Sequence, residues 1–284
     1  YNIKSWYYVK KEDVLARTAG YKSSFLIGLR DVTNATNERT TILSLLPIAA
    51  TTGINLLFVE TTVVDKALFC CNWNSLIFDY VARQKIGGMH LSQNYTKQFP
   101  IISINNYFEF RNIVAKKLLE LSYASWDIKN IADEIWKEAD VNLKEAIQKQ
   151  WEENKTTTGG HKWNPPDWCE IDPGGCPLPP FKWDENRRAI LKAELDAIYA
   201  KLYGLTTEEL RYILDPQDVY GPDFPGETFR VLKEKEIKQY GEYRTRRLVL
   251  EAWERLQKEI ITLPVTVDQN MLDLSLHTGI YSIA

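Results

Sequence analysis

Two polar segments in the first half of the chain carry side chains of the types that read DNA bases. The first supplies Arg30, Asn34, Asn37 and Arg39, and the second supplies Arg83, Lys85, His90, Gln93, Asn94 and Lys97. Arginine and lysine match the edge of guanine, whereas asparagine and glutamine match the edge of adenine. We therefore assign candidate base contacts to Asn34, Arg39, Gln93 and Asn94. Phosphate contacts position a protein without specifying a sequence, and we assign these to Lys85, Lys97, Lys116 and Lys117.

Each of these residues also has a structural alternative. Asparagine and threonine in loops often bond to the neighbouring backbone, and Arg30 could form an ion pair with Asp31. The Gly87-Gly88 pair permits backbone angles closed to other residues, so the chain can turn sharply there and lie close to another surface. The two glycines therefore belong to the predicted DNA-binding set, together with Arg30, Arg83 and His90.

The second polar segment lies within residues 74–102, and its flanks predict how it is held. Leu76, Ile77, Tyr80 and Val81 recur at the spacing of a buried helical stripe before the glycine pair. Residues 99–102 read as an extended segment, since a residue before proline avoids helical angles. The pattern predicts a helix, a glycine turn, a polar loop and a strand.

The rest of residues 1–122 predicts a mixed sheet-and-helix domain of the α+β class. Residues 24–32, 41–50 and 56–59 are rich in branched and apolar side chains and read as strands, with a polar loop at 33–40. Residues 63–83 read as a helix in two pieces meeting near 72–74. Asn105 or Asn106 is expected to cap a helix running to about Ser122.

Residues 123–284 predict a mainly helical module. Helices are expected at 128–152, at 187–203 ending before Gly204, at 208–214, at 228–240 and at 242–261. Thr206 and Glu209 have the spacing of a capping box. Residues 154–181 form an insert rich in proline, glycine and tryptophan that reads as a loop, and residues 262–284 read as a final strand or a tail.

Composition narrows the class of protein. The chain is 44% hydrophobic and 26% charged, as in soluble globular proteins, and no apolar run is long enough to cross a membrane. The net charge is −3, yet residues 1–120 hold 14 Lys+Arg against 9 Asp+Glu, so the first part is the better candidate for a polyanion-binding face. The four cysteines do not make a disulfide framework in a chain of this size, which favours a reducing prokaryotic cytoplasm. Residues 1–20 are aromatic and basic, lack an initiator Met and a signal peptide, and are interpreted as leading from an upstream domain.

Catalytic and metal-binding motifs are weak. Asn164-Pro165-Pro166-Asp167 resembles the Asn/Asp-Pro-Pro-Tyr/Phe motif with which a methyltransferase holds its target amine. Its fourth residue is not aromatic, and no glycine-rich loop for a methyl donor precedes it. A zinc site built from His161, Cys169 and Cys176 lacks a fourth ligand. Glu234, Lys235 and Glu236 read as a solvated helix face, not as a nuclease site, and Arg244, Arg246 and Arg247 as a further solvated face or a phosphate contact.

Three stretches carry a family resemblance: GLRDVTNATNERT from Gly28 to Thr40, the run from Leu76 to Ile102, and KLYGLTTEELRYIL with FPGETFRVLKEKEIKQYGEYRTRRLVLEAWERL. They resemble the C-terminal part of Type IIG-like adenine-specific DNA methyltransferases, the large single-chain methylases of restriction-modification and phage-defence systems. In that family this region lies downstream of the catalytic domain and is regarded as the target-recognition region. The resemblance covers most of residues 20–260 in patches, and none of its motifs is catalytic.

The resemblance implies a fragment that recognises a sequence in double-stranded DNA and is not catalytic alone. The upstream domain of the same polypeptide would bind S-adenosylmethionine and methylate adenine, with or without endonuclease activity in the parent, and this fragment would need no cofactor or metal. The alternative is a protein-interaction module, in which the acidic helical half and the tryptophan-rich insert dock a partner subunit of a DNA-modification or defence complex.

Overall fold

The computed structural model describes residues 9–47 and 53–262, and within them the fold is α+β, as the sequence predicts. A three-stranded antiparallel sheet is formed by β1 (Leu26–Arg30), β2 (Leu43–Leu46) and β3 (Ile54–Leu57), in the order β2-β1-β3. Gly28 pairs with Ser44 on one side and with Leu56 on the other. The three strands predicted in this region are confirmed, and the parts of the predictions that fall on residues 48–52 and 263–284 lie outside the described residues.

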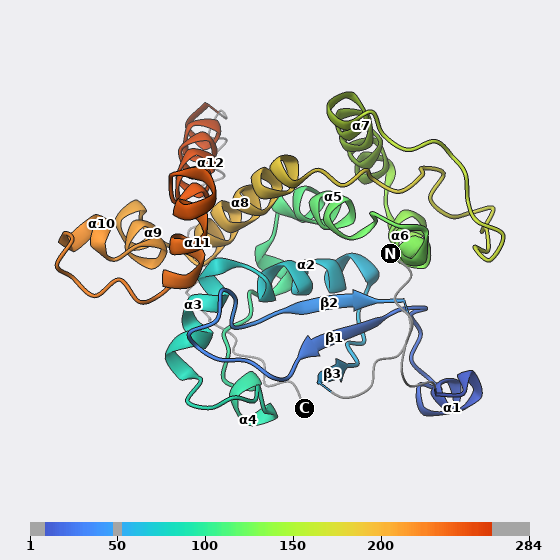
Figure 1. Cartoon of the computed structure of the whole chain (residues 1–284). Coiled ribbons are helices and arrows are strands. Elements are labelled where there is room, and N and C mark those ends of the chain that lie inside the picture. Colours follow the sequence, from blue (N-terminus) through green and yellow to red (C-terminus); the bar gives the residue numbers. More distant parts are fainter. Residues whose placement is uncertain (1–8, 48–52, 263–284) are drawn as a thin grey trace, which may run out of the picture.

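Helices form most of the remaining described chain, and Figure 1 shows α2 alongside β2 with α5 and α8 beyond it. The first group belongs to the part of the chain that contains the sheet and comprises α1 (Lys11–Arg17), α2 (Val63–Trp73), α3 (Leu76–Lys85), α4 (Gln93–Thr96) and α5 (Phe110–Ser122). The second group makes the mainly helical part and comprises α6 (Lys129–Glu138), α7 (Val141–Thr158), α8 (Glu185–Leu202), α9 (Thr207–Leu214), α10 (Gln217–Tyr220), α11 (Arg230–Tyr240) and α12 (Arg244–Thr262).

The sheet part and the helical part share one hydrophobic core. Its buried residues run from Phe25 in the first part to Trp253 in α12. Tyr107 and Tyr199, one from each part, are both buried, and their hydroxyl groups lie 3.3 Å apart. The core is continuous across residues 122 and 123, and the domain boundary proposed there stays a prediction.

The predicted break in the helical stretch of residues 63–83 is confirmed, because α2 and α3 are separate helices. Ser75 begins α3 by accepting a hydrogen bond from Phe78 N at 3.2 Å, as a helix N-cap residue does. Asn74, in the junction, makes two hydrogen bonds with Leu43 of the edge strand β2. Asn74 Oδ1 accepts from Leu43 N at 3.0 Å, and Asn74 Nδ2 donates to Leu43 O at 2.8 Å. The junction therefore fixes the sheet edge against α2 and α3.

Residues 128–152, predicted as one helix, form two. α6 ends at Glu138, and Asp140 starts α7 by accepting from Leu143 N at 2.7 Å. The capping aspartate was readable in the sequence, but the apolar periodicity continues across it and hides the break. α7 also extends to Thr158, into the predicted insert, and Gly159 ends it with a φ of 83°.

Residues 99–102, predicted as a strand, are irregular. Side chains satisfy this backbone in place of a partner strand: Ile102 N donates to Asn72 Oδ1 at 2.9 Å, and Tyr203 Oη donates to Pro100 O at 2.9 Å. The predicted cap at Asn105 or Asn106 is also wrong, because both residues lie in a short 3₁₀ turn and α5 begins at Phe110.

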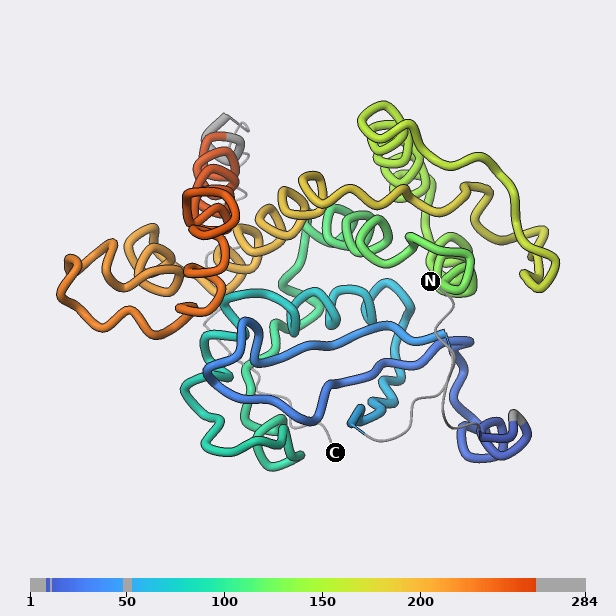
Figure 2. The backbone as a smooth tube through the Cα atoms, viewed as in Figure 1, coloured from blue at the N-terminus to red at the C-terminus, as the bar shows by residue number. Residues whose placement is uncertain are grey.

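The tryptophan-rich insert is irregular, as predicted, and it occupies residues 159–184. Figure 2 shows it as a long excursion between α7 and α8 at the edge of the molecule. The excursion is tied down by Phe181 N donating to Tyr123 O at 2.8 Å and by Trp151 Nε1 donating to Pro179 O at 3.0 Å. The Thr206–Glu209 capping box at the start of α9 is confirmed.

Candidate nucleic-acid interface

The structure joins the two polar loops, which comprise residues 31–41 and residues 86–98. Val32 and His90 form an antiparallel β-bridge, in which Thr33 N donates to Met89 O and Leu91 N donates to Asp31 O, each at 2.9 Å. The His90 Nδ1 atom lies 2.9 Å from Asp31 Oδ2. Segments about sixty residues apart in the chain therefore present one continuous surface.

The 31–41 loop is held from beneath by the carboxylate of Asp79 on α3. Asp79 is fully buried, and its Oδ1 accepts from Thr40 N at 2.9 Å and from Thr41 N at 2.7 Å. Its Oδ2 accepts from Arg83 Nε at 2.9 Å. A buried carboxylate with this set of donors fixes the backbone at the end of the loop.

Arg83 holds the middle of the same loop. Its guanidinium donates to Ala35 O at 2.7 Å, to Asn37 O at 2.8 Å and to Glu38 O at 2.9 Å. It also lies 4.6 Å from the ring centre of Phe229, and its side chain is only 4% exposed. Burial lowers the pKa of Arg83, against the opposing effect of Asp79. Arg83 therefore shapes the loop from inside and does not lie on its outer face.

Arg30 and Arg39 are also engaged within the protein. Arg30 Nη2 donates to Arg39 O at 2.6 Å and to Thr33 Oγ1 at 3.3 Å. Arg39 Nη2 donates to Asn74 O, and the Arg39 side chain lines a cavity on the α8 side of the loop. Arg39 Nε also lies 3.8 Å from Asp79 Oδ2, so Arg39 is engaged within the protein, and the base contact assigned to it stays a prediction.

Seven predicted residues lie exposed along the second loop and its entrance: Lys85, Gly87, Gly88, His90, Gln93, Asn94 and Lys97. Asn34 is exposed on the first loop, where its Oδ1 accepts from Thr36 N at 2.9 Å and from Thr36 Oγ1 at 3.0 Å. This local bond occupies the Asn34 acceptor, so Asn34 can offer a ligand its amide donor but not both groups at once.

The glycine pair differs from its prediction in one respect. Neither Gly87 nor Gly88 has a positive φ, so the backbone there needs no glycine-only angles. A Cβ on Gly88 would meet nothing within 4 Å, and one on Gly87 would meet only Tyr95 Oη at 3.7 Å. What the glycines provide is a bare exposed backbone, so their proposed role in close approach to another surface stays a prediction.

Lys116 and Lys117 lie apart from the loops, on α5. They line a cavity of about 430 Å³ between α5, α7 and α8, and Lys117 Nζ lies 2.5 Å from Glu194 Oε2. Burial lowers the pKa of Lys116, and the charge of Lys117 adds to that effect. The structure does not bring these two lysines together with the other predicted contacts.

The other motifs are placed as follows. Asn164 and Asp167 are exposed within the 159–184 excursion, with no strand before them. Among the described residues, no group of three His, Cys, Asp or Glu is arranged to hold a metal ion. Cys70 and Cys71 are buried, and burial raises the pKa of both thiols.

The charged motifs of the C-terminal helices are mostly paired within the protein. Lys235 pairs with Glu38 at 2.8 Å, and Glu236 accepts from Thr245 N at 2.7 Å. Two of the three predicted basic-cluster residues, Arg246 and Arg247, form ion pairs with carboxylates.

Comparisons of this chain with protein-family models, with curated proteins and with solved structures find no match. Within the described part of the chain, no helix combines the length and the apolar character needed to span a bilayer.

Sequence reasoning missed the supporting role of Asp79. The only available signal was its position four residues before Arg83, a spacing at which oppositely charged side chains meet on a helix. Its bonds to Thr40 and Thr41 depend on tertiary packing.

Proposed function

We propose that this chain is the DNA-recognition fragment of a restriction-modification adenine methyltransferase. The observation that carries the proposal is the bridged pair of loops, which presents exposed amide, imidazole and lysine side chains on a backbone fixed by Asp79 and Arg83. Recognition surfaces need such preorganisation, because loops that order on binding lose affinity to entropy. The family resemblance of these same segments adds the parentage, with S-adenosylmethionine and the methylation chemistry assigned to an upstream domain.

The proposed binding mode divides the exposed residues by chemistry. Gln93 and Asn94 offer the paired donor and acceptor that adenine requires in the major groove. Lys85 and Lys97 lie exposed near them and have no ion pair among the described residues. Their ammonium groups are therefore free to contact phosphates, and Gly87-Gly88 leaves the backbone accessible between them.

Fluorescence anisotropy with a labelled duplex of mixed sequence tests the proposal. The chain is expected to bind, and the affinity to fall as salt rises, because each neutralised phosphate releases counterions. The double variant Lys85→Ala/Lys97→Ala is expected to weaken binding and to flatten the salt dependence. Lys162→Ala is the matched control, since Lys162 is an exposed lysine on the distant 159–184 excursion. Equal affinity of the double variant and the control would refute the assigned surface.

A protein-interaction module remains the second candidate, and one observation favours it. Four apolar side chains of the 159–184 excursion are exposed: Trp163, Trp168, Ile171 and Trp183. Exposed aromatic side chains are enriched where proteins meet. Under this alternative, the chain would form a stable heteromer with a partner subunit and show no binding to duplex DNA at low salt.

A further inference from the structure

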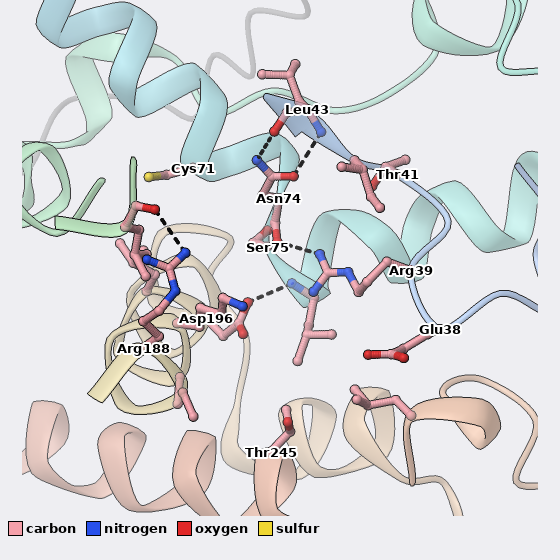
Figure 3. Close-up of a pocket in the computed structure, with 18 of the residues that line it drawn as sticks. Glu38, Arg39, Thr41, Leu43, Cys71, Asn74, Ser75, Arg188, Asp196 and Thr245 are labelled. Carbon is pink, nitrogen blue, oxygen red and sulfur yellow. Dashed lines mark hydrogen bonds between the residues drawn. The ribbon is translucent and has the colours of Figure 1, made fainter. Parts of the chain in front are cut away.

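A cavity of about 750 Å³ opens on the α8 side of the 31–41 loop and is used by none of the contacts assigned above. Its wall is formed by residues 38–45, the α2–α3 junction, the C-terminal end of α5, one face of α8 and the corner between α11 and α12. Figure 3 shows Arg39 on one side of it and Arg188 on the other, with Asp196 between them.

The cavity wall is rich in charge, and its acidic members are occupied. Glu38 pairs with Lys235 at 2.8 Å, and Glu236 accepts from Thr245 N at 2.7 Å. Asp196 accepts from Leu76 N at 2.7 Å, and Glu185 accepts from Trp183 Nε1 at 3.2 Å. These carboxylates therefore have partners other than the basic groups of α8.

Two basic side chains of α8 lack such partners. Arg188 and Lys192 form no ion pair with any described residue, and both line the cavity. Arg188 Nη2 donates to Leu121 O at 2.9 Å, and its guanidinium lies 3.6 Å from the ring centre of Trp183. Its Nε is buried without a hydrogen-bond acceptor. Lys192 stays accessible because it faces the cavity.

The two cations are one helical turn apart, a spacing at which like charges repel. Burial lowers the pKa of Lys192, and the charges of Arg188 and Arg39 lower it further, while Glu185 and Asp196 act in the opposite direction. Burial also lowers the pKa of Arg188. Unpaired cations held together in a concave site mark a place where a negatively charged ligand would be stabilised.

We propose that this cavity binds the phosphate group of a ligand of about mononucleotide size, held by Arg188 and Lys192. The volume falls within the range of small-molecule sites. Arg188 offers a phosphate its charge and the guanidinium donors that Leu121 O does not take, and Lys192 offers a point charge. Leu118, Leu121, Ile128 and Leu232 supply an apolar wall for the rest of the ligand.

The phosphate can come from a free nucleotide or from a nucleotide of a bound DNA strand, and calorimetric titration separates the two sources. AMP is the probe and adenosine its phosphate-free counterpart. AMP is expected to bind at one site per chain, and adenosine at least tenfold more weakly. Arg188→Gln/Lys192→Gln is expected to weaken AMP binding at least tenfold, and the thermal midpoint of the free variant checks that it remains folded.

Lys201→Gln is the matched control, since Lys201 is an exposed lysine on the same helix, nine residues from Lys192 and hence on the opposite face. It is expected to bind AMP as the parent chain does. Displacement of AMP by a duplex would assign the phosphate to DNA, and failure of displacement would assign it to a free ligand. The proposal is overturned if AMP does not bind, or if adenosine binds equally well, or if the double variant and Lys201→Gln behave alike. The loop variants at Lys85 and Lys97 test the DNA-recognition proposal separately.

Discussion

Asp79 and Arg83 lie one turn apart on α3, with Arg83 Nε 2.9 Å from Asp79 Oδ2, and both side chains are almost wholly buried. Between them they bond to the nitrogens of Thr40 and Thr41 and to three carbonyl groups of residues 35–38. The shape of the exposed 31–41 loop is thus determined by an ion pair that a ligand at the surface would not touch.

Arg83→Ala is expected to destabilise the protein by about 3–5 kcal/mol, because it removes the nearer charged partner of a buried carboxylate and leaves only Arg39, 3.8 Å away. Urea unfolding monitored by circular dichroism measures this loss. The neighbouring exposed Gln84→Ala is the control, and its effect is expected within about 0.5 kcal/mol. Equal unfolding midpoints for the two variants would contradict the role of Arg83.

Asn74→Ala is expected to cost about 1–3 kcal/mol, because Leu43 N and Leu43 O then lose both bonds to the Asn74 amide. Hydrogen exchange locates the effect: the Leu43 amide should exchange faster, while the Leu29 amide of the central strand keeps its protection. Asn55→Ala, on β3, serves as the control, because Asn55 is exposed and its side chain makes only a 3.5 Å hydrogen bond to Asp31 Oδ1. A Leu43 amide that exchanges as slowly as before would show that the side chain does not protect the strand edge.

Asp196 gives a pH dependence whose sign is fixed by its burial. Burial raises the pKa of Asp196 to about 6 from its ordinary 3.8, while Arg39, the Leu76 N–H and Lys192 lower it and Asp79 raises it. A raised carboxyl pKa means that the folded state binds the proton more tightly. The stabilisation is therefore complete below about pH 4 and is lost as pH rises through about 6.

Asp196→Asn removes this titration and retains an acceptor for Leu76 N. When the pH rises from 4 to 7.5, the free energy of unfolding of the variant is expected to increase relative to that of the parent by an amount on the order of 3 kcal/mol. Urea unfolding of both proteins at the two pH values gives the difference, in which the shared titrations cancel. A difference that does not change with pH would show that Asp196 ionises at an ordinary pKa.

Gln93→Ala and Asn94→Ala are expected to change which sequence is bound more than how tightly mixed DNA is bound. A lost bidentate contact removes about 1–3 kcal/mol of discrimination at one base pair. Selection from a randomised duplex pool, followed by sequencing, measures this as relaxed preference at adenine-containing positions. Unaltered preferences in both variants would remove these side chains from base contact.

The elements that the sequence predicted well are those set by local signals. The break between α2 and α3 and the capping box at Thr206 each depend on residues within four positions of one another. β1 lies within the strand predicted at 24–32, and β3 overlaps the strand predicted at 56–59; both follow from short runs of apolar and branched residues between polar turns.

Other features depend on which partner a side chain meets across the fold. Arg30, Arg39 and Arg83 belong to the predicted DNA-binding set, and in the structure each of them donates to carbonyl groups of the protein. Residues 99–102 have the composition of a strand, but their backbone bonds to side chains and not to a partner strand. Asn72 accepts from Ile102 N, and Tyr203 donates to Pro100 O. No local pattern indicates which carbonyl or amide a side chain will meet across the fold.

The β-bridge between Val32 and His90 joins the two loops through main-chain hydrogen bonds. Main-chain pairing is indifferent to side-chain identity, so Asn34, Gln93 and Asn94 can be varied together while the platform beneath them keeps its shape. Loops transplanted from a related protein should accordingly be exchanged as a pair, because a single graft would have to rebuild the pairing from a mismatched half.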